Sequence, residues 1–455
     1  MSYYLKMDVD ILQALPLSAE MGGDVDHENI LSLDATRHTP LPSTPTDDED
    51  DVARDAIRVV CRFKPLASSS PTRSSLQSVD IQSTGARKED AGQGVCVLQS
   101  NKAATASSLQ NAMQSGYAPT TDEKQAVTFS FDRIFEPTST QADVYAGCRG
   151  SALVKGPFFP FLPCLASSSA DALVDVLKGC NATIFAYGQT ASGKTHTMMG
   201  PDVEEVTLGE HVGVIPRITS DLFTALAELE AASPRVSVEF GVTVSYLEIY
   251  MENVRDLLNP QQQNDSLTIH EDMMRNVYVK GLRAVTVSSA TDALNLLRRG
   301  NRERVTNSTN MNERSSRSHA IFELSVTLRE HGIRERKAKL SLVDLAGSEK
   351  VYKTGAQGQT LEEAKGINKS LHALGKVINA LTMPNALNDI GAASHIPYRD
   401  SKLTRILQHS LGGNSRTCLI LCAALDREEW SETASTLRFG ARYHPFLFCK
   451  KCTSL

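Results

Sequence analysis

A short glycine-containing segment near the middle of the chain constrains the fold more than any other feature. Residues 188–195 read GQTASGKT and fit the pattern GxxxxGK[ST]. The apolar run 182–187 precedes this segment, and a helix-compatible stretch, 196–199 (HTMM), follows it. In such a strand–loop–helix unit, glycines let backbone N–H groups turn toward phosphate oxygens, and the helix N-terminus adds its dipole. The sequence therefore predicts a phosphate-binding loop within an α/β domain.

Two side chains of this loop have expected roles. Lys194 would reach the β- and γ-phosphates of a nucleotide, and the Thr195 hydroxyl would hold Mg²⁺. A chance match to the pattern is the alternative, and the strand and helix signals on either side argue against it. The expected phosphate-binding residues are Gly188, Gln189, Thr190, Ala191, Ser192, Gly193, Lys194 and Thr195.

Two further segments have the composition of a γ-phosphate sensor. Residues 344–347 (DLAG) follow the apolar run 340–343, where an acid can bind the Mg²⁺ shell and a glycine can offer its N–H to the γ-phosphate. A DxxG sequence alone is also a common turn. Residues 312–319 (NERSSRSH) combine short hydroxyl side chains with arginine. This stretch is either a hydrated polar loop or a switch loop that closes on nucleotide.

Strand and helix patterns alternate from residue 181 onward. Seven apolar residues between Leu361 and Leu381 follow helical spacing over about five turns. Residues 67–126 have the composition of a long loop with one strand near 95–98. Other strands are expected at 57–63, 127–131, 182–187 and 238–249, and at 320–328 and 339–343 as a pair. Alternation around a central sheet predicts an α/β layered domain.

Charge divides the chain into two parts. Residues 1–56 carry 3 basic and 13 acidic side chains, a net of −10 in a chain whose total is −6, so the remainder is +4. Because residues 1–56 also lack hydrophobic periodicity, we expect them to form an acidic disordered head. Irregular cysteines without a secretory signal predict a cytosolic protein with reduced thiols, and no apolar run is long enough to insert into a membrane.

Eight motifs in a single order resemble the kinesin motor domain and cover roughly residues 57–442. They are 61–65 (CRFKP), 184–190 (IFAYGQT), 315–319 (SSRSH), 343–349 (VDLAGSE), 367–371 (INKSL), 397–404 (PYRDSKLT), 411–415 (LGGNS) and 435–440 (STLRFG). Residues 277–282 and 358–365 look most like the conventional kinesin heavy chain. The resemblance implies a P-loop NTPase fold in which helices flank both faces of a central, mostly parallel twisted sheet.

The resemblance also implies a function. It implies an ATP hydrolase that microtubules stimulate, a motor head that uses ATP and Mg²⁺ to move along microtubules of the cytoplasmic cytoskeleton. Neither a nucleic acid nor a membrane is an expected partner, and no oligomer is expected because the chain holds no coiled coil. The alternative is a catalytically weak microtubule-binding module. A P-loop GTPase is disfavoured because the chain has no guanine-reading Asn-Lys-x-Asp motif.

Site roles follow from the matching positions. Arg62 and Pro65 would flank the adenine together with His196, whose alternative role is helix capping. An Arg317–Glu349 ion pair would close both switch segments around the γ-phosphate and position the attacking water. The expected Mg²⁺ residues are Thr195, Ser316 and, through water, Asp344. The expected catalytic residues are Asn312, Ser315, Arg317, Gly347 and Glu349.

The helix beginning near Leu361 and residues 395–407 correspond to the tubulin-facing surface of the family. Tubulin is strongly acidic, so exposed cations are the expected contacts, although each is equally well explained as a solvated charge. Gly366 departs from the family, which commonly has a lysine there. The expected microtubule-facing residues are Lys350, Lys353, Lys365, Lys376, Arg399, Lys402 and Arg405.

Two stretches depart from the family pattern. Residues 147–170 contain three prolines that a helix cannot accommodate, so they are either a translated intron or an apolar binding loop. Residues 443–455 lack a recognisable neck linker, so stimulated ATPase without processive movement is expected. The predicted organisation is a head at 1–56, a motor domain at 57–442 and an atypical tail at 443–455.

Overall fold

The computed structural model describes most of the predicted motor region. The described residues are 55–65, 79–83, 94–99, 126–148, 171–201, 209–232, 238–259, 261, 266–306, 316–330, 334–349, 359–382, 396–412, 415–443 and 447–448. All of them belong to one unit, Val52–Leu455. Residues 1–54 of the predicted head (1–56) and residues 149–170 of the predicted insert (147–170) lie outside the described residues.

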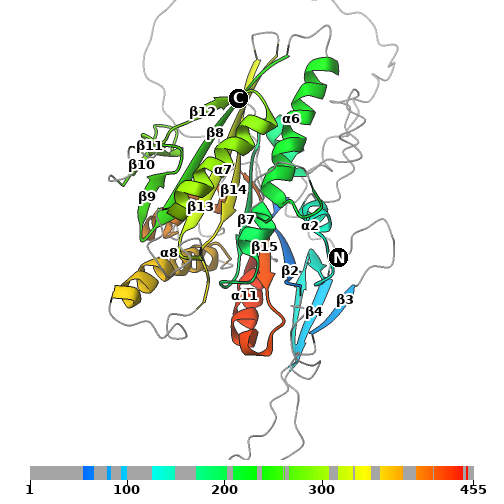
Figure 1. The fold of residues 1–455 in the computed structure, drawn as a ribbon. Helices are drawn as coiled ribbons and strands as arrows, with labels where there is room; N and C mark the ends of the chain where they lie inside the picture. Colours follow the sequence, from blue (N-terminus) through cyan, green and yellow to red (C-terminus); the bar gives the residue numbers. More distant parts are fainter. Residues whose placement is uncertain are drawn as a thin grey trace, which may run out of the picture. The chain divides into compact units, whose positions relative to one another are not determined.

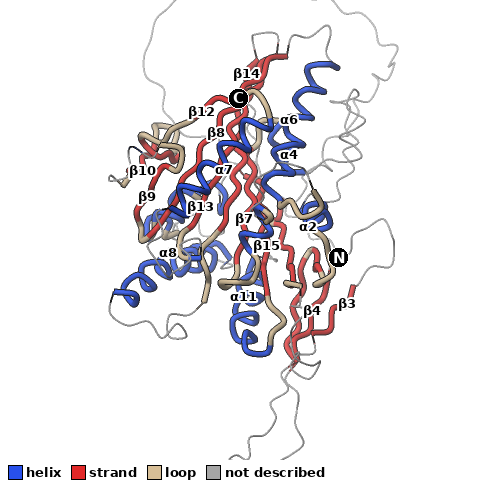
Figure 2. Tube along the Cα trace, in the orientation of Figure 1, coloured by secondary structure: helices blue, strands red, loops and turns tan. Residues whose placement is uncertain are grey.

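A nine-stranded sheet forms the centre of this unit (Figures 1 and 2). Its order is β12 (Val285–Val287), β8 (Val238–Tyr250), β13 (His319–Glu330), β14 (Arg334–Asp344), β7 (Asn181–Tyr187), β15 (Ser415–Ala423), β2 (Arg58–Phe63) and β6 (Arg133–Phe135), with β9 (Asn253–Asp256) paired to β8. The pairs from β14 to β6 are parallel, whereas those from β12 to β14 and the β8–β9 pair are antiparallel. The sheet is thus mixed, with a larger antiparallel share than the sequence suggested.

Helices cover both faces of the sheet (Figure 2). One face carries α2 (Gln141–Cys148), α4 (Asp171–Leu177), α5 (Lys194–Met199), α6 (Val214–Ala232) and α7 (Ala290–Thr306). The other carries α8 (Gln359–Thr382), α9 (Lys402–Ile406), α10 (Gln408–Gly412) and α11 (Trp430–Tyr443), with short 3₁₀ turns η5 (Tyr398–Asp400) and η6 (Arg427–Glu429).

Strand β7 is buried on both faces of the sheet. Ile184 and Ala186 point into the core under α4–α7, while Phe185 and Tyr187 point into the core under α8 and α11. Successive side chains of a strand alternate between faces, so a strand covered on both sides is mostly apolar, and a buried polar residue such as Thr183 needs a hydrogen-bond partner. The nearly continuous apolar run before the glycine loop is therefore explained by its central place in the sheet.

Smaller sheets lie outside this centre. Strands β3 (Val79–Ser83), β4 (Gly94–Gln99) and β5 (Ala126–Phe131) form an antiparallel sheet, and β10 (Thr268–Glu271) pairs with β11 (Val277–Lys280). The strands predicted near 95–98 and at 127–131 are confirmed, whereas β3 was missed within the predicted loop 67–126.

Two predicted boundaries change. Gly147 and Cys148 were placed in the insert but end α2, where the Gly147 carbonyl accepts a 2.9 Å hydrogen bond from Arg58. Tyr443 was placed in the tail but is the buried last residue of α11. Strand β1 (Asp55–Ala56), within the predicted head, pairs with β16 (Leu447–Phe448), within the predicted tail.

Candidate nucleotide site

The glycine loop connects β7 to α5, as predicted. Gly193 caps α5 with a φ of 94°, in the left-handed region where glycine has no steric cost. A Cβ added at Gly188 would lie 2.2 Å from the Cys422 carbonyl of β15, so no side chain fits where the loop leaves the sheet. The loop backbone is thus held close to the sheet at its start and turned toward the helix at its end.

Lys194 is the buried cation of the loop. Its side chain is 5% exposed, and Nζ donates a 2.7 Å hydrogen bond to the Gln189 carbonyl. Burial lowers the pKa of Lys194, while Asp344 and Glu349 oppose this change. The ammonium therefore lies between the glycine loop and the acidic groups of residues 344–349.

Thr195, the residue after Lys194, is hydrogen-bonded to Asp344. The Thr195 hydroxyl donates to Asp344 Oδ2 at 2.8 Å, joining the first turn of α5 to the end of β14. Strands β7 and β14 are parallel neighbours, so their carboxyl ends reach the same edge of the sheet. This shared edge brings together two of the three predicted metal residues.

Arg304 also reaches this edge, although it was not predicted. Its Nη1 lies 3.0 Å from Asp344 Oδ2, and its Nε lies 4.0 Å from Glu248 of β8. It donates further hydrogen bonds to the Ser318 hydroxyl and carbonyl, at 3.2 and 2.9 Å. Burial alone would lower the pKa of Arg304, but Asp344 and the other acidic groups reverse the effect and raise it. Arg304 and Thr195 thus hold the same oxygen, Asp344 Oδ2.

The segment 344–349 is joined to the glycine loop along its length. The Glu349 carboxylate accepts hydrogen bonds from the Thr190 N–H and hydroxyl at 2.8 and 2.6 Å. The Ser348 N–H donates to the Gly188 carbonyl at 3.1 Å. A Cβ at Gly347 would lie 2.3 Å from Glu349 and 2.4 Å from Thr190, which explains the glycine there.

Ser316 and Arg317 belong to the predicted switch loop 312–319, of which residues 312–315 lie outside the described residues. The Gly347 N–H, predicted to face a γ-phosphate, donates to the Ser316 carbonyl at 2.8 Å. Ser316 is therefore beside the 344–349 segment. The Arg317–Glu349 ion pair stays a prediction, and Asn312 and Ser315 lie outside the described residues.

Two of the predicted adenine residues share a hydrogen-bond network. Arg62 is buried and donates to the Gln141 side chain and to the Thr197 hydroxyl, both at 2.8 Å. The Gln141 amide nitrogen lies 3.0 Å from His196 Nδ1 and donates to the His196 carbonyl at 2.7 Å. Burial, followed by the Arg62 charge, lowers the pKa of His196. Gln141, which was not predicted, connects these residues, while Pro65 is exposed two residues after the end of β2.

The predicted microtubule-facing cations differ in accessibility. Arg405 is 16% exposed and pairs with Glu271 of β10, and Arg399 lies 3.5 Å from the same carboxylate. Lys376 pairs with Asp400 at 3.6 Å, and the Lys402 ammonium donates to the Ser266 hydroxyl at 3.2 Å. Arg405 is thus mainly an intramolecular partner. Lys350, Lys353 and the side chain of Lys365 lie outside what the structure describes.

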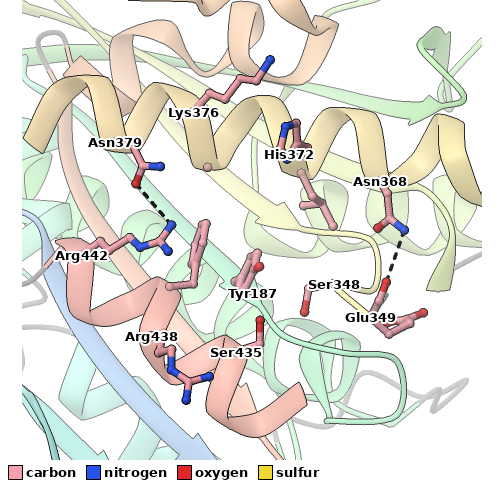
Figure 3. A pocket seen from close by; sticks show the side chains of 13 residues that line it. Tyr187, Ser348, Glu349, Asn368, His372, Lys376, Asn379, Ser435, Arg438 and Arg442 are labelled. Carbon is pink, nitrogen blue, oxygen red and sulfur yellow. Dashed lines mark hydrogen bonds between the residues drawn. The ribbon is translucent and has the colours of Figure 1, made fainter. Parts of the chain in front are cut away.

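A cavity of about 460 Å³ lies between α8 and α11, beside Glu349 (Figure 3). Arg442 of α11 donates to the Asn379 side chain of α8 at 3.3 Å, and Asn368 donates to the Glu349 carbonyl at the same distance (Figure 3). Helix α8 is therefore joined to α11 at one end of the cavity and to the 344–349 segment at the other.

The sequence is similar to those of known proteins. The kinesin motor domain family model matches residues 164–445. The chain is 49% identical over 325 residues to the kinesin heavy chain of Neurospora crassa, covering 71% of this chain and 31% of that protein. It is 42% identical over 395 residues to the kinesin heavy chain of Drosophila melanogaster, covering 86% of this chain and 33% of that protein. It therefore spans about a third of the length of these relatives.

Two solved kinesin structures have a fold similar to that of this chain. A fast kinesin superposes with a TM-score of 0.65 at 41% identity, covering 86% of this chain and 92% of that one. A Kar3-like kinesin motor domain from Ashbya gossypii gives 0.59 at 30% identity, covering 85% and 99%. The predicted P-loop NTPase fold is thus confirmed, and none of the described helices has the length and apolar composition to cross a membrane. The chain belongs to the kinesin motor domain family.

Proposed function

We propose that this chain is a motor head that hydrolyses ATP, and that microtubules stimulate its turnover and are the track for its movement. The observation that carries the proposal is the set of hydrogen bonds between the glycine loop and residues 344–349. Thr195, Thr190 and Gly188 each contact that segment, so a group bound in the loop would act directly on it. This is the arrangement by which a P-loop enzyme senses a γ-phosphate.

The residues present fit a magnesium ion. Mg²⁺ prefers oxygen ligands, and the Thr195 hydroxyl, the Asp344 carboxylate and Ser316 supply them. Asp344 Oδ1 is buried and has no hydrogen-bond partner among the described residues, so one carboxylate oxygen is available. Thr195 and Ser316 would hold the ion, with Asp344 acting through water. The ion would neutralise charge on the phosphates as they separate.

Hydrolysis would rest on positioning and charge stabilisation, without a covalent intermediate. Lys194 would bind the phosphate oxygens. Arg317 and Glu349 would pair and orient the attacking water. Both Glu349 carboxylate oxygens accept hydrogen bonds from Thr190 of the glycine loop, so a group bound in that loop would lie beside this pair.

Exposed cations near α8 and η5 support an acidic polymer as partner. Lys376 is 53% exposed and Arg399 is 76% exposed, and both lie on this surface. Exposed charge pairs are screened by salt. We therefore expect microtubule binding to weaken as ionic strength rises, and we place the protein on the cytoplasmic microtubule cytoskeleton.

The direct test is phosphate release by the purified chain with ATP and Mg²⁺, with and without microtubules. Microtubules should raise turnover. Salt-sensitive cosedimentation with microtubules without any increase in turnover would refute the proposal in favour of a catalytically weak microtubule-binding module.

The switch assignment has a separate test. Glu349→Ala and Arg317→Ala should retain binding of a fluorescent nucleotide and lose the stimulated part of hydrolysis. Arg302→Ala, on the exposed face of α7, is the matched control and should behave as the unaltered chain. Normal stimulated turnover in Glu349→Ala would overturn the assignment.

A further inference from the structure

A buried histidine connects the nucleotide side of the molecule to α8. His319 is the first residue of β13 and is 2% exposed. Its two ring nitrogens face different segments. Nδ1 lies 3.0 Å from the N–H of Ala346, within the 344–349 segment, and Nε2 lies 2.7 Å from the hydroxyl of Ser370 on α8. Ala346 and Ser370 are also buried, at 0% and 2% exposure.

The hydrogen-bond directions in this chain are fixed by its ends. The Ala346 N–H can only donate, so Nδ1 must accept and carry no proton. The proton of the neutral ring is then on Nε2, which donates to Ser370. The Ser370 hydroxyl in turn donates to the Ile367 carbonyl at 2.7 Å. Each group in the chain has a partner, and reversing the tautomer would set two N–H groups against each other at Ala346.

The environment also keeps the ring neutral. Burial, with Arg304 and Lys194 as nearby cations, lowers the pKa of His319 to about 3. A second proton on Nδ1 would also remove the acceptor that Ala346 requires. The ring is therefore neutral near pH 7, as the two hydrogen bonds require.

A second contact lies within one turn of Ser370. The Asn368 amide of α8 donates to the Glu349 carbonyl at 3.3 Å (Figure 3). The 344–349 segment is thus fastened to α8 at two points, through its middle at Ala346 and through its end at Glu349. Of these two, the contact through His319 and Ser370 is buried and shorter.

We infer that His319 is a positioning residue that couples the 344–349 segment to α8 through its neutral, Nε2-protonated imidazole and Ser370. This inference rests on the proposed function, because it describes how that function passes between the nucleotide and α8. Both hydrogen bonds are directional, so a displacement of Ala346 must move the ring or break a buried hydrogen bond, and movement of the ring acts on Ser370. An apolar side chain of similar volume would fill the space but would not fix this geometry.

Ser370→Ala tests the inference because it removes the acceptor of the imidazole N–H and, besides that, only the local hydrogen bond to the Ile367 carbonyl within α8. Ser410→Ala is the matched control, since Ser410 is a buried serine of α10 whose hydroxyl makes a 2.7 Å hydrogen bond to Thr183. In Ser370→Ala we expect basal turnover to be preserved. The acceleration of turnover by microtubules should fall about tenfold, within the usual range for coupling between two sites. Ser410→Ala should retain the full acceleration.

His319 itself gives a complementary pair of variants. Asn in its place keeps an acceptor for the Ala346 N–H and loses the reach to Ser370, so His319→Asn should match Ser370→Ala. Adding Ser370→Ala to His319→Asn should cause no further loss, because one link has already been cut. Additive losses in the double variant would overturn the inference, as would full acceleration in Ser370→Ala.

A measurement without microtubules separates this inference from the proposed function. Amide hydrogen exchange of α8 is compared with ADP and with a non-hydrolysable ATP analogue bound. A nucleotide-dependent change in α8 protection that is present in the unaltered chain and in Ser410→Ala, but absent in Ser370→Ala, would support the coupling even if microtubules fail to stimulate turnover. Equal changes in all three proteins, or no change in the unaltered chain, would overturn it.

Discussion

Arg304→Met should destabilise the fold strongly. The substitution keeps an unbranched apolar stem and removes the guanidinium. Arg304, Asp344 and Glu248 are at most 3% exposed, so the two carboxylates would lose a buried cation. At 3.0 Å and an effective dielectric of about 20, the attraction between Arg304 and Asp344 is about 5–6 kcal/mol before desolvation is subtracted.

Removing one partner of a buried pair typically costs about 3–5 kcal/mol, because the remaining charge is stranded. We expect a loss of that size in the free energy of unfolding, measured by urea titration with circular dichroism. Arg302→Met lies two residues away on the exposed face of α7 and should change stability by no more than about 0.5 kcal/mol.

A double variant measures how strongly Arg304 and Asp344 stabilise each other. Asp344→Asn removes the charge that Arg304 neutralises, so Arg304→Met combined with Asp344→Asn should lose less stability than the sum of the two single changes. If Arg304→Met is as stable as Arg302→Met, or if the two losses simply add, the buried cation does not stabilise this edge of the sheet.

Three further predictions concern packing, pH and charge. Gly440→Ala should cost about 1–3 kcal/mol of stability, because the new Cβ would lie 2.1 Å from the buried Leu421 side chain. In Gly375→Ala the new Cβ meets open space, so this variant should stabilise α8 by about 0.5–1 kcal/mol. Urea titration measures both changes. The pKa of His319 is about 3 in the folded protein, against an ordinary value of 6.5. The contribution of its neutral imidazole to the free energy of unfolding is therefore complete above pH 6.5 and is lost as pH falls toward 3, by no more than about 1.4 kcal/mol per pH unit. His319→Gln should flatten the acid limb of a pH–stability profile, and an unchanged limb would contradict this. Removal of residues 1–51, which carry 2 basic and 12 acidic side chains, should strengthen microtubule cosedimentation at low salt, and unchanged affinity would show that these residues do not oppose binding.

The glycine loop could be predicted because its chemistry is local. Its glycines, Lys194 and Thr195 lie within eight consecutive residues, and the flanking patterns identify the strand and the helix. The fold class followed from the same local signals. The direction in which the strands pair could not be predicted, because the hydrophobic patterns of β8 and β13 would be the same beside parallel and antiparallel neighbours. Strand β3 was missed because its five residues, VDIQS, become a strand mainly through their pairing with β4.

Arg304 could not be found in this way. Helix α7 contains four arginines, at 298, 299, 302 and 304, and nothing in the sequence marks the one that faces the site. Its partners Asp344 and Glu248 are distant in sequence, so only the assembled sheet brings the three together. His319 was noted as part of a motif, but its role depends on Ser370 and Ala346, which reach it from two other elements.

The order of strands in the central sheet has a consequence for how the chain is made. Strand β15 is inserted between β2 and β7, so that Leu419 lies beside Val59 on one side and Phe185 on the other. At a translation rate of about 5–20 residues per second, the β7 edge that pairs with β15 remains unpaired for roughly 10–50 seconds until β15 has been synthesised. Unpaired edges of apolar strands attract other chains. Biogenesis of this protein should therefore depend on chaperones that shield β2 and β7, and translation that stalls before residue 415 should yield aggregates rather than a smaller folded product.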